Sequence, residues 1–251
     1  MNMRGTSVRY SKMRGLLRDL LRAAAGMPLI TVQRTMSLRR LVAAADACQQ
    51  RPPWTAIFVK GYALVARDAD ELRRAYLGFP WARLYQYTHS VANIAVERSY
   101  EDDNIVFHVL VGHPAELSIV EIGTRIRRAQ TGTVGELREF RRALRLAALP
   151  TPFRRITIWL GLNLGRRRSR FFGTFGLSTV AASGAELSNV IWPLGTVLSY
   201  GPFAADGTIN VRLTFDHRVT DAATIARALA RLETILNGAV ADELLEAAAP
   251  R

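Results

Sequence analysis

Two polar side chains near the C-terminus stand four residues apart, where they could move a proton. His217 follows an alternating run from Ile209 to Phe215, and Asp221 precedes a helical run. Histidine takes up and releases a proton near neutral pH, so His217 is a candidate general base. Asp221 stands where a helix N-cap is expected. The alternative is a core histidine bonded to the backbone, with Asp221 serving only as the cap.

The elements around these residues follow from the hydrophobic pattern. Apolar residues occupy the odd positions of 209–215, which predicts a strand with one buried face. His217 has the same parity, so we expect it to point inward at the end of this strand. After Asp221, apolar residues at helical spacing predict a helix; they are Ile225, Leu229, Leu232 and Leu236.

These residues also carry a resemblance to a known family. The segment Asp216-His-Arg-Val-Thr-Asp-Ala222 resembles the Asp-His-Arg-x-x-Asp-Gly motif of the dihydrolipoamide acyltransferases, the catalytic cores of 2-oxo acid dehydrogenase complexes. Chloramphenicol acetyltransferase has a related His-x-x-x-Asp-Gly motif. Upstream, Gly173-Thr-Phe-Gly-Leu-Ser-Thr179 is similar to the family segment Gly-Thr-Phe-Thr-Ile-Ser-Asn. The resemblance covers residues 10–237.

The resemblance implies a fold and a reaction. The fold is α+β, a chloramphenicol acetyltransferase-like two-layer fold with a mixed β-sheet covered by helices. The reaction is acyl transfer between a coenzyme A or carrier-protein thioester and a small-molecule acceptor, with both substrates bound together. His217 would be the general base, Ser178 would donate a hydrogen bond to the oxyanion, and Asp221 would fix the turn. The family also implies a homotrimer with the active site at the subunit interface. The alternative for Ser178 is a polar residue in a Gly/Ser/Thr-rich strand.

Three departures from the family bear on the substrate. We expect a stand-alone core without a lipoyl domain, a covalently attached lipoyl group or a peripheral-subunit-binding domain. Ala222 replaces the glycine of the motif and denies that position the conformations reserved for glycine. The segment Leu149–Arg170 is longer, more basic and more apolar than expected. It could reshape the acceptor channel or dock an acyl-carrier protein.

The charge balance is strongly basic. Lys and Arg number 34 against 21 Asp and Glu, which gives a net charge of +13, and only Lys12 and Lys60 are lysines. An arginine-favouring genome and an anionic partner are both consistent with this balance. A nucleic-acid-binding protein is a further hypothesis, but the arginines are scattered and no nucleic-acid motif is present. A catalytically silent oligomeric scaffold is the remaining alternative.

Composition and motifs bound the remaining organisation. The chain is 49% hydrophobic and has no Gly/Ser linker, so we expect one domain at 10–237, a disordered start at 1–9 and a C-terminal tail at 238–251. Cys48 cannot form an internal disulfide, and no metal site is expected. His89, His108 and His113 are expected to be structural.

Targeting and membrane signals are weak. The N-terminus lacks an apolar signal core, and proline and glycine interrupt the long uncharged run at 187–205. We therefore expect a cytoplasmic protein. The aromatic and basic stretch at 153–170 is a candidate for peripheral membrane contact, and a buried helix with a solvated charged end is the alternative.

The remaining elements are expected from periodicity and breakers. Expected helices are 10–25, 38–48 capped by Ser37, 70–76, 119–130 capped by Ser118, and 134–146. The apolar pattern of 55–67 fits either a helix or a strand, and its length and the family resemblance favour a helix. Expected strands are 29–36, 83–87, 91–96, 105–111, 173–180, 196–200 and 208–215.

Overall fold

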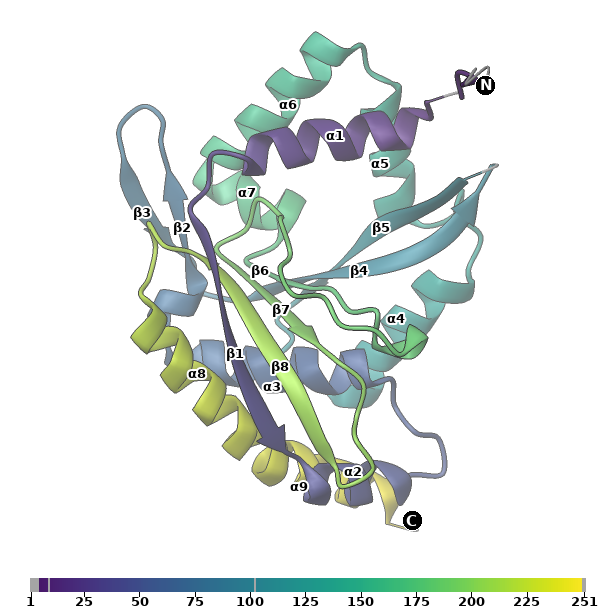
Figure 1. Ribbon diagram of the computed structural model, residues 1–251, viewed down its shortest axis with the longest axis vertical. Coiled ribbons are helices and arrows are strands. Elements are labelled where there is room, and N and C mark those ends of the chain that lie inside the picture. The colour runs from purple at the N-terminus through teal and green to yellow at the C-terminus, as the bar shows by residue number, and fades with distance from the viewer. Residues whose placement is uncertain (1–4, 9, 102, 250–251) are drawn as a thin grey trace, which may run out of the picture.

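A mixed six-stranded sheet forms the centre of the protein (Figure 1). The computed structural model describes residues 5–8, 10–101 and 103–249. The strand order is β1-β8-β7-β6-β4-β5, and β2 pairs with β3 in a separate ribbon. β6 runs parallel to both β4 and β7, whereas the other neighbours in the sheet are antiparallel. The expected α+β fold with a mixed sheet and covering helices is confirmed.

The elements have the following bounds. The strands are β1 (Leu29–Ser37), β2 (Arg74–Leu77), β3 (Arg83–Gln86), β4 (Val91–Tyr100), β5 (Asp103–Gly112), β6 (Phe175–Leu177), β7 (Thr196–Tyr200) and β8 (Thr208–Asp216). The helices are α1 (Lys12–Ala24), α2 (Arg39–Asp46), α3 (Trp54–Asp68), α4 (Ile119–Thr131), α5 (Arg138–Ala148), α6 (Thr151–Asn163), α7 (Gly165–Phe172), α8 (Ala222–Ile235) and α9 (Ala241–Ala248). Short turns of helix are η1 (Asp70–Arg73), η2 (Ala181–Ser183) and the π-helical η3 (Leu236–Val240).

One face of the sheet is covered by α3, α4 and α8 (Figure 1). The central helix α3 is almost fully buried, and its Phe58 ring stacks on Tyr200 of β7 at 4.3 Å. The buried Tyr62 hydroxyl shares a hydrogen bond of 2.7 Å with the Thr196 hydroxyl. This bond satisfies two polar groups that would otherwise be costly to bury. The packing holds β7 and its neighbour β8 in place under the helices.

A second helical group, α1, α5, α6 and α7, lies at one end of the sheet (upper part of Figure 1). A buried ion pair joins α1 to α6, with 2.6 Å between Asp19 Oδ2 and Arg154 Nη2. Arg155 adds a bond of 3.1 Å to the other carboxylate oxygen. Burial by itself raises the pKa of Asp19, but the hydrogen bonds and charges of the two arginines outweigh it and lower that pKa.

Several expectations about single elements are wrong. The segment 70–76 is not one helix, because Arg74–Leu77 forms strand β2 and pairs with β3. Ser37 does not cap α2, since it is the last residue of β1 and is paired with Thr208. The helix expected from residue 134 begins at Arg138. By contrast, Ser118 caps α4 in a full capping box with Glu121, as expected.

The two terminal segments were expected to be a disordered start and a tail. Of the expected disordered start, residues 1–4 and 9 lie outside the described residues, and 5–8 have no regular secondary structure. The segment expected as a tail contains α9, which contacts α2 and buries Leu244. Within the described parts of the chain, no helix is both long and apolar enough to cross a lipid bilayer.

Candidate active site

His217 lies in the turn that follows β8. The strand ends at Asp216, and the backbone N–H of His217 donates to the carbonyl oxygen of Pro28 at 3.0 Å. The histidine side chain is 43% exposed, so the expectation that it points inward is wrong. The alternation of β8 stops with the last paired residue, and the turn carries the next side chain outward. A half-exposed ring is open to a substrate or to another subunit.

The histidine ring is held in one tautomer by the backbone. Its Nδ1 lies 3.0 Å from the carbonyl oxygen of Thr220. A carbonyl oxygen only accepts hydrogen bonds, so Nδ1 carries the proton and Nε2 presents a free lone pair. This is the arrangement that a general base requires. It comes from the turn itself and needs no carboxylate.

Asp221 occupies the N-cap position of α8 without acting as a side-chain cap. Its backbone is extended, as an N-cap requires, but its carboxylate makes no hydrogen bond to the first turn of the helix. The side chain is 81% exposed, and its Oδ1 lies 3.6 Å from His217 Nδ1. This distance exceeds that of a normal hydrogen bond. Asp221 therefore adds negative charge beside the ring, while Thr220 orients it.

The two residues that flank the histidine form a clamp that sequence reasoning did not assign. The buried carboxylate of Asp216 accepts two hydrogen bonds from the Arg218 guanidinium, at 2.9 and 2.7 Å. It also accepts one from the Arg218 backbone N–H. The guanidinium lies over the Tyr76 ring, 4.2 Å from its centroid. Strand periodicity gave no signal for this clamp, because β8 ends at Asp216 and Arg218 lies in the turn that follows.

Ser178 lies directly after β6, which is separated from β8 by β7, and it lies near the end of β7 that is opposite to His217. Its backbone N–H donates to the carbonyl oxygen of Leu198 at 3.1 Å, and its side chain is half-buried. Within the described residues, the Ser178 hydroxyl makes no hydrogen bond. It is thus free to donate to a ligand.

Within one chain, Ser178 and His217 are far apart. Leu177 pairs with Leu198, whereas Asp216 meets Gly195 at the other end of β7. The two residues are therefore about five residues apart along the strand direction, roughly 16 Å, and about 10 Å apart across it. Their side chains cannot contact the same carbonyl group. His217 and Asp221 are brought together, and Ser178 is not.

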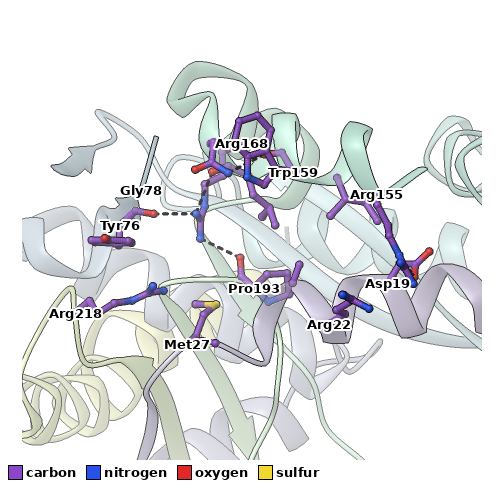
Figure 2. A pocket seen from close by; sticks show the side chains of 15 residues that line it. Asp19, Arg22, Met27, Tyr76, Gly78, Arg155, Trp159, Arg168, Pro193 and Arg218 are labelled. Atoms are coloured by element: carbon purple, nitrogen blue, oxygen red, sulfur yellow. Dashed lines mark hydrogen bonds and ion pairs between the residues drawn. The ribbon is translucent and has the colours of Figure 1, made fainter. Parts of the chain in front are cut away.

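A cavity of about 450 Å³ lies beside the histidine turn (Figure 2). Arg218 and Met27 line its edge near His217, and Arg168 stands in its wall. Arg168 is buried and donates to the carbonyl oxygens of Tyr76 and Pro193 at 3.2 and 3.0 Å. Burial lowers the pKa of this guanidinium. Arg22 and Arg155 also line the cavity, so cationic groups outnumber the single carboxylate of Asp19.

One cluster in the described part of the chain could hold a metal ion. His89, His113 and Glu116 offer ligand atoms that all lie within 4.8 Å of one another, and all three are exposed. Two imidazoles and a carboxylate suit a divalent cation such as zinc. The cluster lies at the base of the β4–β5 hairpin and contains none of the expected site residues.

Solved structures of acyltransferases share this architecture. A truncated catalytic core of the 2-oxoacid dehydrogenase multienzyme complex of Thermoplasma acidophilum matches with a TM-score of 0.67 at 18% identity, covering 94% of this chain and 99% of that one. A dihydrolipoamide acetyltransferase of Azotobacter vinelandii, studied for the catalytic roles of a serine, a histidine and an asparagine, matches with 0.68 at 15% identity, covering 94% of each chain. A chloramphenicol acetyltransferase matches with 0.51 at 12% identity, covering 92% of this chain and 98% of that one.

The chain has the chloramphenicol acetyltransferase fold. The resemblance inferred from the two motifs is confirmed at this level. No protein-family model matches the sequence, and no curated protein matches it significantly. At these identities the chloramphenicol acetyltransferase fold is established and the activity is not, so the chemistry has to be argued from the residues.

Proposed function

We propose that the protein is an acyltransferase that moves an acyl group between a coenzyme A or carrier-protein thioester and a small acceptor. The observation that carries this proposal is the His217 ring. Its Nδ1 is committed to the Thr220 carbonyl, its Nε2 is free, and the ring is half-exposed on an acyltransferase fold. Such a histidine can accept a proton from an attacking thiol, hydroxyl or amine.

The reaction follows from these groups. As the acceptor attacks the thioester carbonyl, its proton passes to Nε2 of His217, and the carbonyl oxygen becomes an oxyanion. The Ser178 hydroxyl donates a hydrogen bond to that oxyanion. When the tetrahedral intermediate collapses, the carbon–sulfur bond breaks, and the imidazolium returns the proton to the departing thiolate. The acyl group has then moved, and the histidine is neutral again.

Two copies of the chain are needed for this site. Because His217 and Ser178 lie at opposite ends of β7, we place the serine of one subunit against the histidine of its neighbour in a homotrimer. The similar pyruvate dehydrogenase cubic core is an assembly of such chains. In the Azotobacter enzyme the histidine and the asparagine stand four residues apart, like His217 and Asp221.

The donor is assigned from charge. Coenzyme A carries several phosphate charges, and arginine binds phosphate bidentately. The arginine-lined cavity of Figure 2 lies beside the histidine turn, and we place the coenzyme there. A coenzyme A thioester and the free thiol of Cys48 both fit a cytoplasmic location.

A carrier protein is the alternative donor. The exposed face of α6 presents Phe153 and Trp159, and α7 follows it with Arg166 and Arg167 exposed. An aromatic surface next to arginines fits an acidic carrier protein. A membrane surface would use the same residues, in which case binding to anionic vesicles would replace binding to the carrier.

Calorimetry with coenzyme A tests the proposal first. We expect saturable binding of about one molecule per subunit at low salt, weakened at higher salt because arginine–phosphate contacts are screened. Acetyl-CoA with a panel of small thiols, including dihydrolipoamide, then tests transfer. If neither coenzyme A binding nor transfer from a carrier occurs, the fold serves as a catalytically silent scaffold.

Replacement of Ser178 by alanine should slow transfer with little effect on assembly. Loss of one oxyanion donor typically lowers kcat by about 10²–10³-fold. Steady-state kinetics with acetyl-CoA measure the effect. Ser183→Ala is the matched control, because Ser183 lies a few residues away in η2 and should leave kcat unchanged. An unchanged kcat in Ser178→Ala would remove the serine from the mechanism.

A further inference from the structure

A larger cavity is lined by residues of α1, α5, α7 and β5. These elements lie in the upper part of Figure 1. Its volume is about 930 Å³. His217, Ser178 and Asp221 do not line it. The cavity is therefore separate from the residues proposed for acyl transfer.

One wall of the cavity is apolar. Leu16 and Leu20 of α1 are buried there, facing Val106 and Leu110 of β5. Trp192 is also buried in the lining, with its ring stacked on His108 at a centroid distance of 4.1 Å. Such a wall favours an alkyl chain over water, because burial of apolar surface is the main source of affinity in ligand pockets.

The part of the lining around His108 is polar but neutral. His108 Nδ1 lies 2.6 Å from Asn93 Oδ1, and the Asn93 amide group donates to the Phe172 carbonyl. The amide oxygen only accepts, so Nδ1 carries the proton. Burial lowers the pKa of His108 to about 4, and the ring is uncharged at neutral pH. No charge in this part of the lining repels an apolar chain.

The rim is cationic. Six arginines of α5 and α7 line it, namely Arg138, Arg141, Arg142, Arg145, Arg167 and Arg170, against a single carboxylate, Glu139. Across the described residues, none of these six guanidinium groups forms an ion pair. Burial, and then the charges of Arg170 and Arg138, lower the pKa of Arg142. The rim thus holds repelling like charges that an anion would relieve.

We propose that this cavity binds a single-chain anionic amphiphile, an alkyl chain that ends in a phosphate or a carboxylate. The chain lies along α1 and β5 towards Trp192, and the anionic head lies among the guanidinium groups of α5 and α7. Planar guanidinium forks match both head groups bidentately. The proposal is independent of the acyl-transfer reaction.

Titration with dodecyl phosphate, below its critical micelle concentration, tests the ligand class by calorimetry and tryptophan fluorescence. We expect one site per subunit. Butyl phosphate and inorganic phosphate should bind at least about tenfold more weakly, because each buried methylene contributes a factor of about four. Dodecyl maltoside should not bind. Dodecanoate serves as the carboxylate arm, and the tighter of the two anionic ligands identifies the head group.

Charge reversal tests the arginines. Arg138→Glu with Arg141→Glu changes two exposed residues of the rim and should weaken dodecyl phosphate binding at least about tenfold. The matched control is Arg125→Glu with Arg128→Glu, an exposed pair at the same spacing on α4, and should change it less than about twofold. Circular dichroism confirms that both variants fold.

Four results would overturn the proposal. They are no binding of either anionic ligand, equal binding of dodecyl maltoside, inorganic phosphate binding as tightly as dodecyl phosphate, and equal weakening by both charge reversals. A competition experiment separates this site from the donor site. Coenzyme A should leave dodecyl phosphate bound, whereas full displacement would assign the cavity to the coenzyme and would be a fifth result against the proposal. An enzyme inactive in acyl transfer that still binds dodecyl phosphate would leave this proposal standing.

Discussion

His217→Ala is expected to lower kcat for acyl transfer by about 10²–10⁴-fold, the contribution of a well-placed general base. The backbone carbonyl of Thr220 fixes the ring through Nδ1 and leaves Nε2 to accept the proton. The hydrogen bond from the backbone N–H of His217 to Pro28 and the clamp between Asp216 and Arg218 do not depend on the imidazole. The turn should therefore persist, and light scattering should show an unchanged oligomer. Initial rates with acetyl-CoA measure the effect.

A second exposed histidine provides the control for that variant. His89 lies at the base of the β4–β5 hairpin, and His89→Ala should retain wild-type kcat. The account would be contradicted by a His217→Ala protein that transfers acyl groups at the wild-type rate. Equal losses in both variants would indicate a general effect on folding or assembly.

Asp19→Ala is expected to lower the free energy of unfolding by about 3–5 kcal/mol, the usual cost of breaking a buried ion pair on one side. Asp19 is 2% exposed and Arg154 is 5% exposed. Without the carboxylate, the Arg154 guanidinium remains buried with only neutral partners, the carbonyls of Ala147 and Leu149 and the Thr151 hydroxyl. Urea denaturation followed by circular dichroism measures the loss.

An exposed pair shows how much burial matters. Arg231 and Asp68 are 2.5 Å apart, but both side chains are substantially exposed. Asp68→Ala should cost less than about 1 kcal/mol. Similar losses in the two variants would refute the special role of the buried pair.

The Asp19 carboxylate makes the stability of the protein depend on pH. The pKa of Asp19 is lower in the folded protein than its ordinary value of 3.8, so the unfolded chain binds a proton more readily. The contribution of the pair is fully present above that ordinary value and is lost as the pH falls through the lower, folded value. Asp19→Ala should flatten this part of the acid-denaturation profile.

Local sequence patterns correctly predicted several elements whose signal lies within the segment itself. The strand at 196–200 and the capping box at Ser118 lie where the sequence places them. The prediction of one helix at 70–76 was wrong. Its first four residues form a helical turn, but Arg74–Leu77 forms a strand that pairs with residues further along the chain. Local propensity cannot anticipate such a pairing.

The candidate site was only partly accessible to sequence reasoning. The motif located His217 and Asp221 and gave their order. The alternation of inward and outward side chains was extended beyond the end of β8, and this wrongly predicted that the His217 ring points inward. The backbone acceptor at Thr220 leaves no trace in side-chain patterns, and neither does the clamp between Asp216 and Arg218. The separation of Ser178 from His217 depends on the order of β6, β7 and β8, which only the folded sheet reveals.

The most direct test of the central claim is a complementation experiment between two inactive variants. His217→Ala and Ser178→Ala chains carrying different tags are co-expressed, and the mixed oligomers are isolated through both tags. If each site combines the histidine of one subunit with the serine of the next, every mixed trimer holds one intact site in three, so about one third of the wild-type sites are restored. The account predicts recovered acyl transfer in the mixture and almost none in either parent. A mixture as inactive as its parents would contradict a shared site.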